Sequence, residues 1–452
     1  MNDTIYALAT PLGGGVAVAR LSGPGAEKAL RAVFSRREEY ESHKLYHGTI
    51  LDGGEPVDDA LAVLMRAPHS YTGEDCAELH IHGSPAVARQ LLELLSRSGL
   101  RLAQPGEFTR RAFENGRLQL SQAEAVMDLV SASAREEARA ALRQLKGSLV
   151  QTVGTLQDRL TDAIARAEAG IDYPEEDWDQ EIQAELTPEL EDIALKIGRL
   201  IAGGAQGRLL RDGLKVALCG RPNVGKSSLL NAILGQQRAI VTAQPGTTRD
   251  VIEEAVDWKG LPIRLMDTAG LRSAEDEVER IGVDLAKQAM KEADLLLLVF
   301  DGAEPLCAAD EEVLREAEGR PAVAVIAKSD LAQRLSAETL AARPELSGVP
   351  VVSASSVEEG GLEALKEEVY RYFERLAPAE RPDEMVTNRR HLDALERARA
   401  SVLSAILAFD LADLDCATID LRAAWRALGE ISGQTVDEAI VDRIFAKFCL
   451  GK

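Results

Sequence analysis

Cysteine is scarce in this chain of 452 residues. The five cysteines are scattered, they include no CxxC pair, and the six histidines do not cluster with them. They are Cys76, Cys219, Cys307, Cys416 and Cys449. The sequence therefore predicts neither a zinc site nor a disulfide framework.

Long hydrophobic runs are also missing. The longest apolar stretches, such as residues 295–300, fall far short of the roughly 20 residues that a membrane-spanning helix needs. The first ten residues have no basic segment ahead of an apolar one, so we expect no secretory signal. These observations predict a cytoplasmic protein without a membrane partner.

Basic charge is low, with 52 Lys and Arg against 74 Asp and Glu and a net charge of −22. Most of the surface should repel nucleic acid, so any role on RNA requires a local basic patch or a basic partner. The 46% hydrophobic and 28% charged residues are typical of a soluble globular protein. The length predicts two to four domains.

Four regions differ in their residue pattern. Residues 1–118 mix turns with short β-like runs at 15–21, 61–65 and 77–82, which predicts an α+β domain. Residues 119–210 contain apolar positions three and four apart and almost no proline, as in long amphipathic helices. Residues 211–378 alternate short apolar runs with helix-like stretches, which predicts a parallel sheet wrapped by helices. The helical pattern returns at 379–452, so we expect a helical domain interrupted by an inserted α/β domain. The strands expected in the insertion are 214–219, 261–266, 295–300, 322–327 and 349–352.

The strongest motif spans residues 220–227 and matches GxxxxGK[ST]. It follows the expected strand 214–219 and precedes a helix-like stretch at 228–234. Glycines let the backbone N–H groups turn toward phosphate oxygens, and the following helix offers its N-terminus to the same anion. Lys226 adds a positive charge at the β- and γ-phosphates, and the Ser227 hydroxyl can ligate Mg²⁺. This pattern predicts a nucleotide-binding P-loop.

Later motifs indicate guanine. Asp267–Gly270 (DTAG) closes the next strand, where the aspartate can hold Mg²⁺ through water, and Thr247 and Thr248 lie in a loop between the two motifs. Asp330, in the segment AKSD, can accept hydrogen bonds from N1 and the 2-amino group of guanine, a donor pair that adenine lacks. The segment Ser353–Ser355 can close over the base. Together these elements predict a GTPase.

Two positions depart from the usual GTPase pattern. Ala327 stands where GTPases usually have asparagine, which removes one polar contact to the base. Leu271 stands where many regulatory GTPases have a glutamine that positions water. Leucine cannot orient water, so another group must do this, and Glu279 is a candidate.

The chain resembles the MnmE (TrmE) family of tRNA-modification GTPases over essentially its whole length. Besides the GTPase motifs, the resemblance rests on residues 3–11, 71–75 and 105–113 and on the terminal FCLGK of residues 448–452. It implies an N-terminal domain that binds folate and dimerises, a helical domain and an inserted G domain.

The resemblance also implies the activity and the partners. Such proteins form homodimers and join the FAD-dependent protein MnmG in a heterotetramer, in which FAD belongs to MnmG. Together they attach an aminomethyl or carboxymethylaminomethyl group to carbon 5 of the wobble uridine of certain tRNAs. A tetrahydrofolate derivative, the 5,10-methylene or 5-formyl form, occupies the folate site, and the methylene form supplies the one-carbon unit. GTP hydrolysis drives conformational cycling and is activated by K⁺ when two G domains meet.

Site residues follow from the motifs and the resemblance together. The GTP-binding residues would be Asn223, Val224, Gly225, Lys226, Ser227, Ser228, Thr242, Ala243, Gln244, Pro245, Gly246, Thr247, Thr248, Asp267, Thr268, Ala269, Gly270, Lys328, Asp330, Ser353, Ala354 and Ser355. Mg²⁺ would be held by Ser227 and Thr248, and K⁺ by Asn223, Thr242, Gln244 and Thr247. Folate would contact Arg20, Glu78, Arg117 and Lys452. The catalytic residues would be Arg249, Glu279 and Cys449.

An alternative is a ribosome-assembly or signalling GTPase, which switches between partners without folate chemistry. The G domain by itself is compatible with both functions. The N-terminal domain and the FCLGK tail favour the tRNA-modification family, because such switches lack both.

Overall fold

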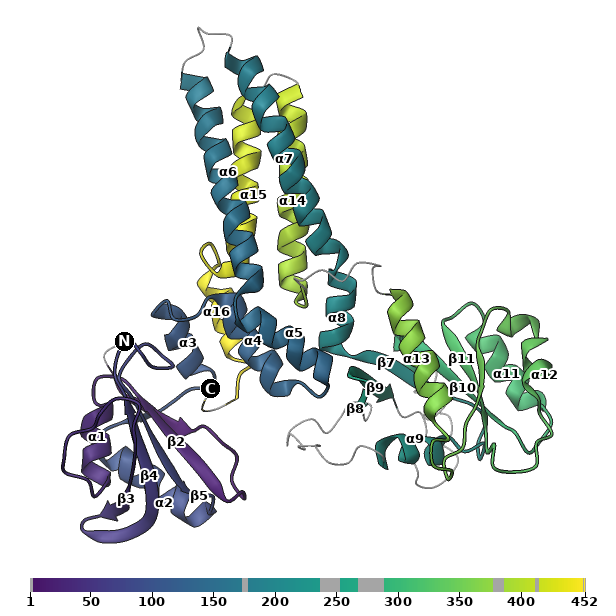
Figure 1. Cartoon of the computed structure of the whole chain (residues 1–452), viewed down its shortest axis with the longest axis horizontal. Helices are drawn as coiled ribbons and strands as arrows, with labels where there is room; N and C mark the ends of the chain where they lie inside the picture. The colour runs from purple at the N-terminus through teal and green to yellow at the C-terminus, as the bar shows by residue number, and fades with distance from the viewer. Residues whose placement is uncertain are drawn as a thin grey trace. The chain divides into compact units, whose positions relative to one another are not determined.

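The computed structural model describes residues 3–172, 178–235, 253–266, 288–376, 386–410, 414–449 and 451. The chain divides into two compact units, and Figure 1 labels their helices and strands. The first unit contains residues 1–127, 145–164 and 422–452, and the second contains residues 128–144 and 165–421. In the part of the chain that is described, no helix combines the length and the hydropathy that crossing a membrane requires.

The first unit is built on a six-stranded sheet. In spatial order its strands are β3 (Leu45–Asp52), β4 (Glu55–Met65), β5 (Cys76–His82), β2 (Val16–Ser22), β1 (Ile5–Leu8) and β6 (Arg101–Leu102). Neighbouring strands are antiparallel except β1 and β6, which run parallel. The three β-like runs expected from the sequence overlap β2, β4 and β5, which confirms an α+β fold here.

Alternation of residues along β2 and β5 separates two faces of this sheet. Ala19, Leu21 and Leu79 are fully buried, and they pack with α1 (Ala26–Val33) and α2 (Pro85–Arg97) in one hydrophobic core. Arg20 and Glu78 alternate with these residues and therefore point to the opposite face, where they are only partly buried.

Within the first unit, the C-terminal residues pack against the N-terminal part of the chain. α3 (Glu107–Glu114) contacts α16 (Glu438–Phe445), and Phe445 and Phe448 share a small core with Leu120. A Cβ added to Gly451 would lie 2.0 Å from the carbonyl oxygen of Leu8. Gly451 therefore lies directly against the end of β1, so the two ends of the chain meet in one unit.

The second unit contains the inserted sheet. In spatial order its strands are β12 (Val351–Ser353), β11 (Ala322–Ala327), β10 (Leu295–Asp301), β7 (Leu214–Cys219), β9 (Leu261–Met266) and β8 (Glu253–Trp258). The five expected strands are present and parallel, although β12 begins two residues later than expected. The sixth strand, β8, was not expected; it pairs antiparallel with β9 at the edge, so the sheet is mixed.

Both faces of this sheet are covered, which explains why every residue of β10 and β11 is buried. α9 (Lys226–Gly235) and α13 (Glu363–Leu376) contribute to the core on one face. α11 (Ala308–Ala317) and α12 (Ala337–Ala341) contribute to the core on the other. The result is the helix-wrapped sheet that the sequence predicts.

Long helices make up most of the remaining chain, as expected. They are α4 (Leu120–Ser131), α5 (Arg135–Leu145), α6 (Ser148–Asp172), α7 (Trp178–Ala202), α8 (Gly204–Asp212), α14 (Arg389–Asp410) and α15 (Leu414–Ser432). In the second unit, α7 and α14 run side by side (Figure 1). These two helices lie on either side of the insertion in the sequence, so the helical part is assembled from both flanks of the sheet.

Candidate functional site

The P-loop connects β7 to α9 and adopts a tight curl. Gly220, Asn223 and Gly225 have φ values of 155°, 66° and 106°, which L side chains rarely adopt. A Cβ at Gly220 would also lie 2.4 Å from the carbonyl oxygen of Val299 in β10. Glycine is therefore required at position 220, because the loop leaves the sheet in contact with the neighbouring strand.

Lys226 holds this curl from within. It is the first residue of α9, and its ammonium group donates to the carbonyl oxygens of Gly220 at 2.6 Å and Arg221 at 2.7 Å. Ser227 and Ser228 follow it in the first turn and are exposed. Their hydroxyls and the helix N-terminus therefore face solvent, where a phosphate and its metal ion can approach.

A cavity of about 220 Å³ lies beside the P-loop. Its lining comes from the P-loop and α9 and from the loops that follow β11 and β12: Gly225, Ser228, Leu229, Ala327, Lys328, Asp330, Leu331, Ala354, Ser356 and Val357. The carboxyl ends of neighbouring parallel strands meet at one edge of a sheet, which is why these distant segments come together. The cavity combines the segments that the sequence assigns to phosphate and to guanine.

The segment Ser353–Ser355, which the sequence predicts to close over the base, lies only partly at the cavity. Ala354 lines the cavity, whereas Ser353 is exposed at the end of β12 and is absent from the lining. Ser355 is buried and donates from its hydroxyl to Asp330 Oδ1 at 2.8 Å, which orients that carboxylate. Sequence reasoning missed Ser356, which lines the cavity one residue farther along.

Arg221 is a second residue that sequence reasoning missed. Its guanidinium donates to Glu304 Oε2 at 2.5 Å and to Asp310 Oδ2 at 3.2 Å. Asp310 is buried at the start of α11, so these bonds anchor the P-loop to the helix on the far side of β10. A basic residue inside the motif is the sequence signal, but nothing local indicates its acidic partners.

Two of the predicted folate residues form an ion pair. Arg20 and Glu78 are register partners on β2 and β5, and Arg20 Nε lies 2.8 Å from Glu78 Oε1. The Arg20 guanidinium also lies 5.0 Å from the ring centroid of Tyr71 and 5.8 Å from that of Phe108. A hydrogen bond with His80 and the charge of Arg20 outweigh burial and lower the pKa of Glu78 below its usual value. Glu78 is therefore an ionised acceptor at neutral pH.

The other predicted folate and tail residues are more dispersed. Arg117 donates to the carbonyl oxygen of Ser70 at 3.2 Å. Cys449 is an exposed thiol, and its carbonyl oxygen accepts a hydrogen bond from the Gly106 N–H at 3.4 Å.

Many of the predicted residues lie outside the described part of the chain. They are Thr242, Ala243, Gln244, Pro245, Gly246, Thr247, Thr248, Arg249, Asp267, Thr268, Ala269, Gly270, Leu271, Glu279 and Lys452. Five of the predicted GTP residues that the structure does describe, Gly225, Ser228, Lys328, Asp330 and Ala354, come together around the cavity.

Comparisons with known proteins cover the whole chain. The family model described as the MnmE helical domain matches residues 120–449, and the model described as the GTP-binding protein TrmE N-terminus matches residues 4–117. The tRNA modification GTPase MnmE of Heliobacterium modesticaldum is 46% identical over 469 residues, which cover 100% of both chains. The protein of that name from Geobacter sulfurreducens is 44% identical over 463 residues, again 100% of both chains. The chain belongs to the MnmE family.

One solved structure is similar to part of this chain. The G domain of the FeoB iron transporter of T. maritima is 33% identical and covers 35% of this chain and 98% of its own, with a TM-score of 0.27.

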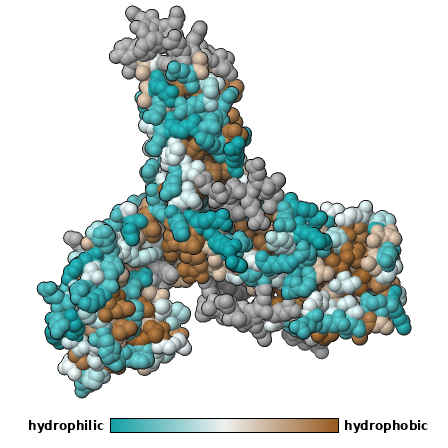
Figure 2. Space-filling view, in the orientation of Figure 1, coloured by the Kyte–Doolittle hydropathy of each residue, from teal (hydrophilic) through white to brown (hydrophobic). Residues whose placement is uncertain are grey.

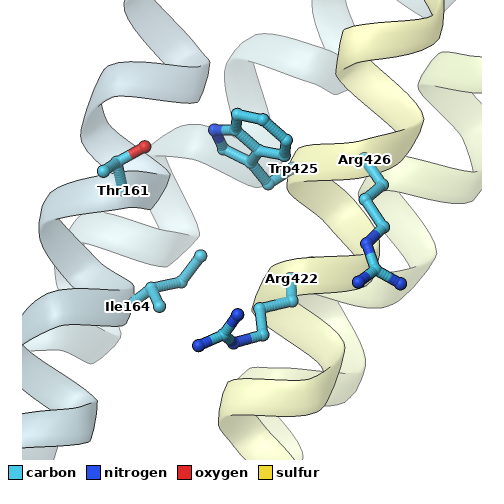
Figure 3. A pocket seen from close by; sticks show the side chains of 5 residues that line it. All are labelled: Thr161, Ile164, Arg422, Trp425 and Arg426. Carbon is cyan, nitrogen blue, oxygen red and sulfur yellow. The ribbon is translucent and has the colours of Figure 1, made fainter. Parts of the chain in front are cut away.

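A second cavity, of about 320 Å³, lies in the first unit between α6 and α15. It is lined by Thr161, Ile164, Arg422, Trp425 and Arg426. In Figure 3 the Trp425 ring extends toward α6 at about the level of Thr161, and the guanidinium groups of Arg422 and Arg426 lie below it. The family resemblance assigns no function to this cavity.

The reactivity of Cys219 tests the packing beneath the P-loop. Burial at the end of β7 raises the pKa of this thiol to about 12, against an ordinary value near 9. The thiol therefore stays protonated, and thus unreactive, up to high pH. At pH 8.5, iodoacetamide should modify the exposed Cys307 and Cys449 at least ~100-fold faster than Cys219, as measured by peptide mass spectrometry.

Urea-denatured protein is the control, in which all five cysteines should react. Equal labelling of Cys219 and Cys307 in the folded protein would show that the end of β7 is not packed as described.

Proposed function

We propose that this chain hydrolyses GTP as one component of a tRNA-modifying complex that acts on the wobble uridine. The observation that carries the proposal is the cavity at the P-loop, which Asp330 enters from the loop after β11. It occurs in a chain that belongs over its full length to a family whose members are named tRNA modification GTPases. We propose four domains, with bounds at 1–118, 119–210, 211–378 and 379–452.

The P-loop geometry supports binding of GTP with Mg²⁺. Lys226 already lies against the loop, and a bound nucleotide would offer it phosphate oxygens in place of carbonyl oxygens. Ser227, exposed in the first turn of α9, and Thr248 would hold the Mg²⁺, which supplies charge stabilisation to the transferring phosphoryl group. We assign Arg249 and Glu279 to the hydrolysis step.

Replacing Lys226 tests the central activity. Lys226→Ala should lower GTP turnover about 100-fold, because the variant loses a cation at the developing negative charge. A strain that lacks this chain should lack the wobble-uridine modification by nucleoside mass spectrometry, and Lys226→Ala should fail to restore it.

Lys196→Ala is the matched control, because Lys196 pairs with Asp192 on α7 and does not line the cavity. It should restore both readouts. An intact modification in the deletion strain, with no second copy of the protein, would reject the proposed role.

We further propose that K⁺ activates hydrolysis when the G domains of two chains meet. A monovalent cation beside the β–γ bridge can supply the charge that an arginine finger supplies elsewhere. Asn223, exposed on the P-loop, would provide one ligand, and Thr242, Gln244 and Thr247 would complete the set.

Asn223→Gly tests the side chain of Asn223 as a K⁺ ligand without changing the backbone conformation. Glycine accepts the φ of 66° at this position, so the substitution removes the side chain and its oxygen without straining the backbone. GTP turnover should be faster in KCl than in NaCl for the natural chain, and this advantage should largely disappear in Asn223→Gly. Equal rates in both salts for the natural chain would contradict K⁺ activation.

We propose that a tetrahydrofolate derivative binds at Arg20 and Glu78. An ionised Glu78 suits the paired N–H donors of a pterin ring, and cations such as Arg20, Arg117 and Lys452 suit the glutamate tail. The position of Gly451 against Leu8 supports the proposal, since Leu8 pairs with Ala19, the residue before Arg20. The exposed thiol of Cys449 lies in the same C-terminal segment as Gly451, and we assign it a catalytic role at this site.

Calorimetry with 5-formyl-tetrahydrofolate tests this site. Arg20→Ala should weaken binding at least about tenfold, because a hydrogen bond to a charged group is lost. GTP turnover should not change. Arg97→Ala is the control, since Arg97 pairs with Asp52 elsewhere on the same unit. Absence of binding heat in the natural chain would reject the folate site and favour a GTPase switch without folate chemistry.

We propose a homodimer formed through the first unit. Val16, Leu45 and Leu61 are 62%, 53% and 38% exposed, although they lie on sheet strands. Leu45 and Leu61 lie on the neighbouring strands β3 and β4, and Val16 lies on β2, which β5 separates from β4. Figure 2 shows apolar surface on this part of the molecule. Such a surface favours contact with another chain.

We propose MnmG, which brings its own FAD, as the partner that makes most of the contacts to tRNA phosphates. The net charge of −22 on this chain supports this, because a strongly acidic surface repels phosphates.

A further inference from the structure

Asp301 occupies a distinctive place at the edge of the inserted sheet. It is the last residue of β10, and its register partner on β11 is Ala327. Position 327 is the one where GTPases usually have asparagine. Asp301 therefore lies next to the position where the usual asparagine side chain is absent. Asp301 is buried, with a residue exposure of 7%.

The two carboxylate oxygens of Asp301 have separate partners. Oδ1 accepts the N–H of Ala303 at 2.9 Å, and Oδ2 accepts from the ammonium group of Lys328 at 2.5 Å. Burial favours protonation, but these hydrogen bonds outweigh it and lower the pKa of Asp301. The group is therefore an anion at neutral pH.

Lys328 links Asp301 to the P-loop. Its ammonium group also donates to the carbonyl oxygen of Asn223 at 3.3 Å. Its backbone has a φ of 59°, a left-handed conformation that is costly for a lysine and needs support from its surroundings. Lys328 lines the cavity together with Asp330, two residues on. Its position therefore affects both the P-loop and the base-binding segment.

Ala327 lies close to the P-loop but cannot form a side-chain hydrogen bond with it. A Cβ added to Gly225 would lie 3.8 Å from the Ala327 Cβ, so position 327 faces the P-loop backbone. A methyl group cannot form a hydrogen bond with that backbone, whereas an asparagine amide can donate and accept. In this chain, the described side-chain hydrogen bond from this segment to the P-loop comes from Lys328.

We propose that Asp301 is a positioning residue for guanine nucleotide binding, which holds Lys328 against the P-loop, where the alanine at position 327 cannot form a hydrogen bond. The proposal rests on the proposed function, since it assumes that the cavity binds a guanine nucleotide. Asp301 acts through Lys328 and does not itself line the cavity.

Asp301→Asn tests the charge without removing the turn contact. The asparagine amide oxygen can still accept from the Ala303 N–H, while the anionic partner of Lys328 is lost. Dissociation of a fluorescent GDP analogue, followed by stopped flow, should be about tenfold faster, the size expected for loss of a hydrogen bond between charged groups.

The Ala327→Asn background distinguishes positioning of Lys328 from a general effect on stability, because a general effect would be the same in both backgrounds. Ala327 lines the cavity, so there is room for the larger side chain. In the Ala327→Asn background, Asp301→Asn should accelerate GDP dissociation by less than about threefold, because the asparagine amide can itself form a hydrogen bond with the P-loop backbone. Glu367→Gln, which removes a carboxylate paired with Lys259 elsewhere in the unit, should leave dissociation unchanged.

The outcomes are distinct. Unchanged dissociation in Asp301→Asn would overturn the proposal, and so would an equal acceleration in both backgrounds, which would indicate a general loss of stability. If Asp301→Asn lowers the melting temperature of the nucleotide-free protein, the comparison between the two backgrounds still decides. Failure of the natural chain to bind GDP at all would instead reject the proposed function.

Discussion

The nucleotide site depends on the carbonyl oxygens of a short backbone segment, residues 220–225, being held in a curl by lysine ammonium groups. Lys226 binds two of these carbonyls from within the motif, and Lys328 approaches a third from the loop after β11. Lys226 begins the helix that follows β7, and Lys328 follows the end of β11, so the parallel sheet brings both cations to one loop. The carboxylates of Asp301, Glu304 and Asp310 then hold the second lysine and Arg221.

The same sheet is attached to the helical part through the turn between β8 and β9. One oxygen of Asp257 accepts the N–H of Arg135 at 3.1 Å, and the other accepts the N–H of Gly260 at 2.6 Å. The carbonyl oxygen of Gly260 accepts the N–H of Glu136 at 2.9 Å. The first N–H groups of α5, which have no partners within the helix, are thus satisfied by this turn. Since β9 ends at Met266, directly before the DTAG motif, the strand that leads into a nucleotide motif begins at a helix contact.

In the inserted sheet, the central strands were predicted more accurately than the edge strands, for a physical reason. Strands buried on both faces, such as β10 and β11, are continuous apolar runs bounded by polar residues, so they could be found almost to the residue. β8 could not, because an edge strand of sequence EEAVDW has one exposed side and no such run. β12 is only three residues long and partly exposed, and its apolar signal begins before the strand does.

By itself, the sequence determined the P-loop, the order of the nucleotide motifs and the family. These depend on residues that are adjacent in the chain, where a motif and its flanking strand and helix can be read directly. The tertiary structure alone decided the pairing of Arg20 with Glu78, of Lys328 with Asp301 and of Arg221 with Asp310, and the packing of Gly451 against Leu8. The three ion pairs join residues 27, 58 and 89 positions apart, and Gly451 and Leu8 lie near opposite ends of the chain. A charge pattern does not specify which of many carboxylates a cation meets, because register and strand order make that choice.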